Sequence, residues 1–84
     1  MSKKEYEQAK KYIGNVIYKY RRVKKNISQE ELAARTDTDA NNLGRIERGE
    51  QFPEFLTFEK ICYELGIKQE VYLSELIELT KEEK

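Results

Sequence analysis

Apolar side chains recur every three or four residues along much of this chain, which is the spacing of an amphipathic helix. Gly14 interrupts the first such stretch at a cost of about 1 kcal/mol relative to alanine, so we expect a close packing contact there. The segment Val23–Ile27 is predicted to be a basic connector. The apolar positions of this first stretch form one stripe and predict a long helix over residues 4–23. They are Tyr6, Ala9, Ile13, Val16, Ile17 and Tyr20.

Residues 28–49 predict two short helices joined by a tight turn. Ser28 opens the first of them, and Glu31 follows three residues later. This is the spacing of a capping box, in which each side chain satisfies the free amide of the other residue. Leu32 and Ala33 supply the apolar face, and Thr36–Thr38 is the expected turn.

The second of these helices is expected to begin at Asp39, whose carboxylate can accept hydrogen bonds from first-turn amides. Leu43 and Ile46 should face the core, and Gly49 should end the helix because glycine tolerates left-handed backbone. The first turn carries small, polar, uncharged side chains suited to base edges. Two helices with this surface favour sequence-specific DNA binding.

Two further helices follow a loop at residues 50–54. One is expected from about Phe55 to Leu65, with Gly66 as its stop signal and Phe58, Ile61, Cys62 and Leu65 as its buried stripe. The other is expected over residues 69–81, in a C-terminal segment (69–84) with more apolar surface than one narrow stripe needs. Its apolar residues are Val71, Tyr72, Leu73, Leu76, Ile77 and Leu79.

The length of 84 residues favours one domain over residues 1–84, and sparse glycine and proline with abundant charged residues favour an all-α protein. Histidine is absent, so the common imidazole base and metal ligand is missing. The single cysteine, Cys62, allows no internal disulfide and no cysteine-rich metal site, which fits a reducing cytoplasm. No apolar run is long enough to span a bilayer or to act as a signal peptide. We therefore expect a cytoplasmic protein with no cofactor, no metal and no membrane contact.

Enzyme activity is disfavoured because the chain has no phosphate-binding glycine loop and no nucleophile with a plausible base. The formal net charge is zero, but it is unevenly distributed. Residues 1–35 hold ten Lys or Arg and four Glu, whereas residues 50–84 hold four Lys and nine Glu. A basic front could orient the molecule on a phosphate backbone, although two solvated helix faces could differ in charge by chance.

At this point the order of residues resembles the DNA-binding domain of lambda-repressor and Cro-type (XRE-like) helix-turn-helix regulators. The resemblance runs from about Ile13 to Leu76 and implies a compact five-helix bundle that dimerises on DNA, with the helix-turn-helix at about residues 28–48. Each motif alone is weak evidence for the family, but together, in this order and at this spacing, they are highly specific for it. They are Ile13-Gly14, Ser28–Ala33, Arg45–Glu50, Pro53 and Phe58–Ile67.

The chain departs from the family pattern in the turn and in the connector. Asp37 and Thr38 stand where the family usually has Gly then Val. Aspartate can occupy a left-handed turn position at modest cost, and the Thr38 methyl must replace an apolar side chain under the turn. The connector before Ser28 is about one residue longer than usual. Asp37 and Asp39 also bring negative charge near the end of the helix that would face DNA.

The resemblance implies base contacts from Ala40, Asn41, Asn42 and Arg45. Asparagine can donate to and accept from adenine, the arginine fork matches guanine O6 and N7, and alanine can meet a thymine methyl. Gly44 would leave space on the same surface for close approach to the groove wall. The structural alternative is that Asn41 and Asn42 are only helix-start residues, which asparagine favours.

The resemblance also places Gln29 at a position that commonly meets a DNA phosphate. Lys24, Lys25 and Arg48 are further candidates for phosphate contacts, with solvated charge as the alternative. Glu47 matches a position that pairs with an arginine of the first helix, so Arg21 is its expected partner and Arg22 the second choice. We interpret Glu47 as structural rather than catalytic, and Cys62 as a packing residue rather than a reactive thiol.

The fifth helix is the expected dimer surface, through Val71, Leu73, Leu76 and Ile77. A twofold dimer would place two recognition helices about one DNA turn apart, so the operator should be an inverted repeat. The alternative is that these residues simply cover the first helix.

Three classes of function follow. The leading hypothesis is a dimeric transcription regulator, a repressor before an activator, or a related antitoxin that autorepresses its operon and binds a toxin. The second is a protein-interaction module that has kept the fold without DNA binding, with an unknown protein partner. The third, an enzyme, has no candidate site.

Overall fold

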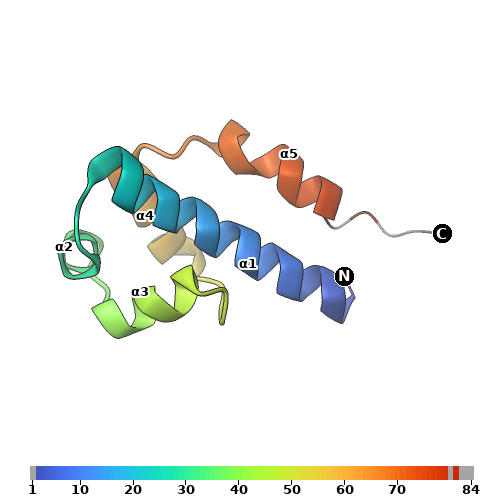
Figure 1. Ribbon diagram of the computed structural model, residues 1–84, viewed down its shortest axis with the longest axis horizontal. Coiled ribbons are helices and arrows are strands. Elements are labelled where there is room, and N and C mark those ends of the chain that lie inside the picture. Colours follow the sequence, from blue (N-terminus) through green and yellow to red (C-terminus); the bar gives the residue numbers. More distant parts are fainter. Residues whose placement is uncertain (1, 80, 82–84) are drawn as a thin grey trace.

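The computed structural model describes residues 2–79 and 81, and the described residues form the predicted all-α bundle of five helices (Figure 1). A π-helical segment, η1, continues the first helix. The elements are α1 (Lys3–Lys19), η1 (Tyr20–Lys25), α2 (Gln29–Arg35), α3 (Ala40–Glu47), α4 (Phe55–Leu65) and α5 (Gln69–Leu79).

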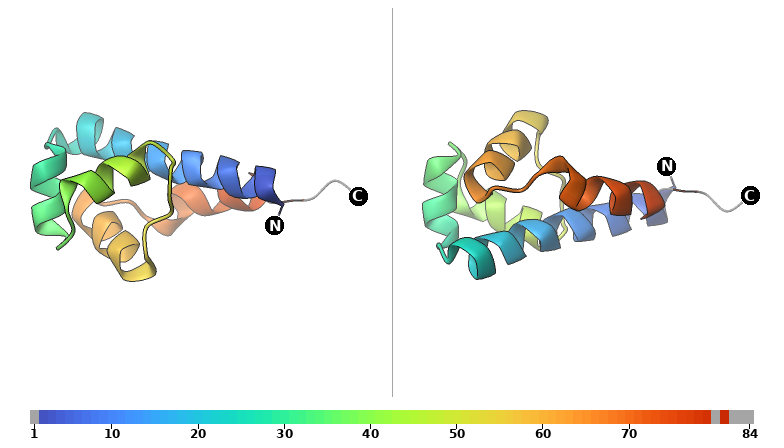
Figure 2. Two further views of the ribbon diagram at one scale, coloured as in Figure 1. Left: turned by 90° about the horizontal axis from the view of Figure 1, so that it is seen from below. Right: turned by 90° about the horizontal axis from the view of Figure 1, so that it is seen from above.

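α1 is the longest element; α3, α4 and α5 pack against it, whereas α2 packs on α3 and α4. α5 runs antiparallel to α1 along its N-terminal half, while α2 lies across the far end of the molecule (Figures 1 and 2). α3 packs on α1 on the side away from α5, and α4 contacts η1, α1 and α2. The short α2 and α3 are therefore held at one end of the bundle by two longer helices.

The core lies where α1, α2, α3 and α4 meet. The predicted stripe of α1 is buried at Ala9, Ile13 and Ile17, but Tyr6 remains 46% exposed and packs edge-on against Phe52 with ring centroids 5.1 Å apart. Tyr6 lies too near the start of α1 to reach the core. The buried core cluster comprises Ile13, Ile17, Leu32, Ala33, Leu43, Ile46, Ile61, Cys62, Leu65 and Ile67.

Gly14 lies where α1 crosses α3. A Cβ atom at this position would stand 2.7 Å from the carbonyl oxygen of Glu47 and closer still to that of Ile46. The two helix backbones touch here with no room for a side chain, which explains why a glycine is tolerated inside a long helix. The close contact expected from the sequence is confirmed.

The end of the first helix differs from the prediction. The chain stays helical to Lys25 instead of leaving the helix near Val23, and the last six residues are π-helical. The segment closes at Asn26, whose backbone is left-handed (φ 54°) and whose N–H donates to the Arg21 carbonyl. Because a π turn holds more residues than an α turn, η1 can take up the extra residue of the connector without displacing Ser28.

The helix caps agree with the prediction only in part. Ser28 Oγ accepts from the Glu31 N–H at 3.0 Å, but the Glu31 carboxylate accepts from Arg35 Nε at 2.8 Å. The second half of the expected capping box is replaced by this ion pair one turn further along the helix. A complete capping box joins Ser2 and Glu5 at the start of α1 instead.

α5 has no buried residue among those described, and it ends at Leu79, short of the expected residue 81. Residues 80 and 82–84, which belong to the predicted 69–84 segment, lie outside the described residues. Among the described helices, none combines the length and the apolar character needed to cross a membrane.

Candidate nucleic-acid interface

α2 and α3 form a compact pair of helices joined by the four residues Thr36–Asp39. Thr36 is buried and its hydroxyl donates to the Leu32 carbonyl at 2.8 Å, while the Thr38 N–H donates to the Ala33 carbonyl at 3.0 Å. Asp37, between them, has a left-handed backbone (φ 57°), which aspartate can adopt at modest cost. The departures from the family turn are thus accommodated by local hydrogen bonds.

Asp39 is the N-cap of α3, as predicted. Its carboxylate accepts from the Asn42 N–H at 2.6 Å. An acidic side chain at a helix N-terminus is stabilised by the unpaired amides and the helix dipole. Asp39 therefore has a structural role at the end of the helix where its charge was expected to repel phosphate.

α3 buries one face and leaves its first turns accessible. Leu43 and Ile46 are completely buried, whereas Asn41 and Arg45 are exposed. Of the other predicted base contacts, Ala40 is partly buried against the core and Asn42 is half-buried. The four residues lie on one short helix, and of these four Asn41 and Arg45 are the exposed ones.

Asn42 and Arg45 are joined through Gln51, which the sequence analysis did not single out. Asn42 Nδ2 donates to Thr38 Oγ1 at 3.2 Å, and Asn42 Oδ1 accepts from Gln51 Nε2. Gln51 Oε1 in turn accepts from Arg45 Nε at 3.4 Å. A chain of polar side chains therefore runs along the edge of α3.

Gly44 does not open space for a DNA groove wall as expected, because it is buried beneath two side chains. A Cβ atom there would lie 3.2 Å from Arg48 Nη1 and 3.6 Å from Gln29 Oε1. Gln29 crosses α3 at this point and donates through Nε2 to Glu47 Oε1 at 2.9 Å. One N–H of its side-chain amide is thus used within the motif, and a Cβ at Gly44 would make only ordinary contact with this amide.

Glu47 and Arg21 form the expected structural pair. Arg21 Nε lies 2.6 Å from Glu47 Oε2, and Arg21 Nη2 lies 3.0 Å from Oε1, so the fork binds both carboxylate oxygens. Both side chains are about 95% buried, with exposures of 5% and 4%. Arg21 Nη1 also donates to the Ile27 carbonyl at 2.8 Å. The pair ties η1 and the start of α2 to the end of α3, which fixes the angle at which α3 is presented.

Comparison with known proteins agrees with this geometry. The family model described as a helix-turn-helix domain matches residues 14–80, a range that contains α2, α3 and α4. The chain belongs to the helix-turn-helix family. Nothing matches the chain among curated proteins or among solved structures.

Membership of the helix-turn-helix family confirms the resemblance inferred from the sequence. A helix-turn-helix is a DNA-binding unit whose second helix enters the major groove. Here α2 is the first helix and α3 the second, the recognition helix. The exposed first turns of α3 are the part of the recognition helix that reaches base edges in such motifs.

The basic residues expected to meet phosphates are all at the surface. Lys24 and Lys25 are exposed at the end of η1, just before α2. Arg48 follows α3 and pairs with Glu50 at 2.7 Å, and this contact lowers the pKa of the Glu50 carboxyl. Any phosphate contact by Arg48 must therefore compete with a carboxylate, whereas the two lysines have no such partner among the described residues.

The apolar residues of α5 divide into two groups. Tyr72 and Leu76 pack against the core, and the Tyr72 ring meets Phe58 edge-on with centroids 5.3 Å apart. Val71, Leu73 and Ile77 stay exposed, at 38%, 38% and 50%. Only part of the apolar surface of α5 is thus used to cover the bundle.

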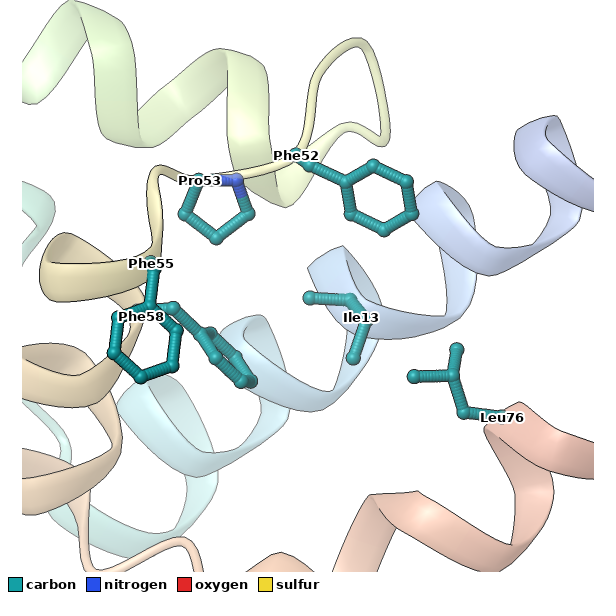
Figure 3. A pocket seen from close by; sticks show the side chains of 6 residues that line it. All are labelled: Ile13, Phe52, Pro53, Phe55, Phe58 and Leu76. Carbon is teal, nitrogen blue, oxygen red and sulfur yellow. The ribbon is translucent and has the colours of Figure 1, made fainter.

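A shallow apolar pocket of about 290 Å³ opens beside Leu76. In Figure 3, Leu76 faces it from α5, Ile13 from α1, and the aromatic side chains from α4 and the loop before it. The pocket therefore continues the apolar surface of α5 toward α4. It is lined by Ile13, Phe52, Pro53, Phe55, Phe58 and Leu76.

Two other exposed features lie on α4. Leu56 is 68% exposed and Tyr63 is 85% exposed, and both border a second shallow groove with Arg35. Cys62, on the opposite face of α4, is buried, and burial raises the pKa of its thiol to about 11. A protonated buried thiol is inert, which agrees with the packing role expected for it.

Proposed function

We propose that this chain is a sequence-specific transcription regulator that binds an inverted-repeat operator as a dimer. We favour a repressor over an activator. The observation that carries the proposal is the division of α3. Its apolar face, with Leu43 and Ile46, is buried in the core. Asn41 and Arg45 are exposed on the first turns of α3, the part of a recognition helix that meets base edges.

Direct readout supplies the chemistry. Asn41 and Asn42 carry amides that match the N6 and N7 edge of adenine, and Arg45 carries the fork that matches guanine, each worth about 1–3 kcal/mol of discrimination. Ala40 is the candidate for a thymine methyl, at the partly buried edge of the helix. Lys24, Lys25 and Arg48 would supply phosphate contacts, with Gln29 limited to its backbone N–H and the second N–H of its amide.

The exposed apolar residues of α5 support dimerisation. A monomer that leaves Val71, Leu73 and Ile77 in water gives up hydrophobic free energy of about 25 cal/mol per Å² of apolar area that a partner could cover. A twofold dimer that reads an inverted repeat requires its two recognition helices to lie about 34 Å apart, one turn of DNA.

A titration of a fluorescent mixed-sequence duplex tests DNA binding first. We expect binding at low salt that weakens steeply as salt rises, since each phosphate contact contributes about −0.9 to the slope of log K against log salt. Lys24→Ala with Lys25→Ala should reduce the slope by about two. Lys3→Ala with Lys4→Ala removes the same charge from the start of α1 and should change it less. Absence of binding at low salt would reject the proposal.

One observation favours a second function. Leu56 and Tyr63 form an exposed apolar surface on α4 that no described element covers, and such surfaces mark protein contacts. A protein-interaction module, or an antitoxin that also represses its own operon, would use it. A module without DNA activity would give no salt-dependent binding in the titration, whereas an antitoxin would bind DNA and also a protein partner.

A further inference from the structure

Gln51 lies in the loop between α3 and α4 and contacts two residues of the recognition helix at once. Its Nε2 donates to Asn42 Oδ1, and its Oε1 accepts from Arg45 Nε at 3.4 Å. The Gln51 side chain is half-buried. One amide therefore links two of the four residues proposed to contact bases.

The end of α3 explains why a residue from the loop reaches back to the helix. Gly49 has a left-handed backbone (φ 78°), and the Glu50 N–H donates to the Arg45 carbonyl at 2.9 Å while the Gly49 N–H donates to the Ile46 carbonyl at 3.0 Å. This pair of bonds is the Schellman motif, which folds the chain back over the last turn. The next residue, Gln51, is thereby placed beside Arg45.

The hydrogen bonds of Asn42 leave it suited to one further contact. A side-chain amide has two N–H groups and two oxygen lone pairs. Asn42 uses one N–H for Thr38 and one lone pair for Gln51. One N–H and one lone pair remain, which is the pair that a bidentate contact to adenine requires. Because bonds at both ends oppose rotation of the amide, its donor and acceptor sides are fixed before DNA binds.

Arg45 is held in a comparable way. Gln51 engages Nε, the nitrogen nearest the backbone, and the two terminal nitrogens carry the N–H groups that a guanine contact uses. Holding the chain at Nε reduces the rotamers that Arg45 must lose on binding, and a preorganised contact costs less ordering.

We infer that Gln51 is a positioning residue for base recognition: it fixes the side chains of Asn42 and Arg45 together, so base preference at two positions of each half-site depends on one loop amide. This inference rests on the proposed function. It adds to it a specificity-determining residue outside the recognition helix.

The experiment compares Gln51→Ala and Gln51→Glu with wild type on the duplex that wild type selects from a random pool, and on each single-base-pair variant of that duplex. Gln8→Ala, at an exposed position on α1, is the matched control. Gln51→Ala should weaken the selected duplex about five- to tenfold and flatten the preference at two positions of each half-site, with mixed-sequence affinity within about twofold of wild type. Gln51→Glu keeps an acceptor for Arg45 but cannot donate to Asn42, so it should flatten one position only.

An equal loss on every sequence would make Gln51 a phosphate contact and overturn the inference, as would an unchanged preference profile. A DNA-free measurement separates this failure from that of the proposed function. The side-chain amide signals of Asn42 should shift in the NMR spectrum of Gln51→Ala and not in that of Gln8→Ala. A shift without any DNA binding by wild type would support the Gln51–Asn42 hydrogen bond but overturn both the proposed function and the role of Gln51 in base recognition. No shift would overturn the hydrogen bond itself.

Discussion

Arg21 of η1 donates hydrogen bonds to both carboxylate oxygens of Glu47 at the end of α3, which lies 26 residues further along the sequence. Both side chains are almost completely buried. The pair connects the π-helical segment to the recognition helix, and Gln29 completes it from α2. The relative placement of η1, α2 and α3 therefore depends on one carboxylate. Removing either partner leaves the other charge buried without compensation.

The first prediction concerns this pair. Glu47→Gln should lower the free energy of unfolding by about 3–5 kcal/mol, because it strands the Arg21 guanidinium in the core. Arg21→Lys should have a smaller but clear effect, since an ammonium cannot bind both oxygens in parallel. Urea denaturation monitored by circular dichroism measures the change.

The control for the pair is Glu31→Gln, which breaks an ion pair between Glu31 and Arg35 whose side chains are 51% and 44% exposed. Exposed pairs contribute at most about 1 kcal/mol. Equal losses for Glu47→Gln and Glu31→Gln would contradict the role given to the buried pair.

The second prediction compares two glycines. Gly14→Ala should destabilise the fold by about 1–3 kcal/mol even though alanine favours helices, because the new methyl meets backbone carbonyls of α3 that cannot move aside. Gly44→Ala meets the flexible end of Arg48 instead, and alanine's helix propensity should make it neutral or stabilising by up to about 1 kcal/mol. A melting temperature of Gly14→Ala at or above wild type would refute the close helix crossing.

The third prediction uses the thiol of Cys62. Burial raises the pKa of this thiol from its ordinary value of 9.0 to about 11, so native protein at pH 8 should react with a thiol reagent only as fast as it unfolds. The unfolded chain loses its proton at a lower pH than the folded chain. The contribution to stability is therefore complete below about pH 9 and is lost as the pH rises through about 11.

Burial also raises the pKa of the Tyr12 and Tyr72 hydroxyls, which acts in the same direction. Urea midpoints measured from pH 7 to pH 11 should fall above pH 9, and less steeply in Cys62→Ala. Rapid labelling of native protein at pH 8, or a midpoint that rises toward pH 11, would count against the assigned environment.

The fourth prediction addresses self-association through α5. Ile77→Glu places a charge on the exposed apolar surface of α5 and should convert a dimer into a monomer in sedimentation velocity experiments. Leu56→Glu makes the same change at an exposed position on α4 and should leave the association state unchanged. A wild-type monomer at high concentration, or dissociation by Leu56→Glu alone, would argue against the α5 interface.

Much of the fold could be predicted because local rules and burial agree. The cap at Asp39 agrees with the spacing of Leu43 and Ile46 in placing α3. The stop at Gly66 gives the end of α4. The end of the first helix could not be predicted, because helical periodicity does not distinguish an α turn from a π turn. The buried Arg21 lies within this π-helical segment, and its contacts with Glu47 and the Ile27 carbonyl are tertiary contacts that the sequence pattern does not show.

The site was predicted less completely, and for a physical reason. Sequence spacing places Asn41, Asn42 and Arg45 on one short helix, but it does not show which polar side chains are already bonded within the chain. The missed signal for Gln51 was Gly49, since a glycine that ends a helix in a Schellman motif returns the following residues to the last turn.

Selection from a random-sequence DNA pool tests the central claim most directly, when wild type is compared with Asn41→Ala and Arg45→Ala. The Asn41 side chain is exposed and the N-cap of its helix is Asp39. Asn41→Ala should therefore leave the melting temperature close to that of wild type. We predict that wild type enriches an inverted repeat, and that each variant loses preference at its own position in both half-sites. Failure of wild type to enrich any motif, or the same motif from all three proteins, would contradict DNA recognition by the first turns of α3.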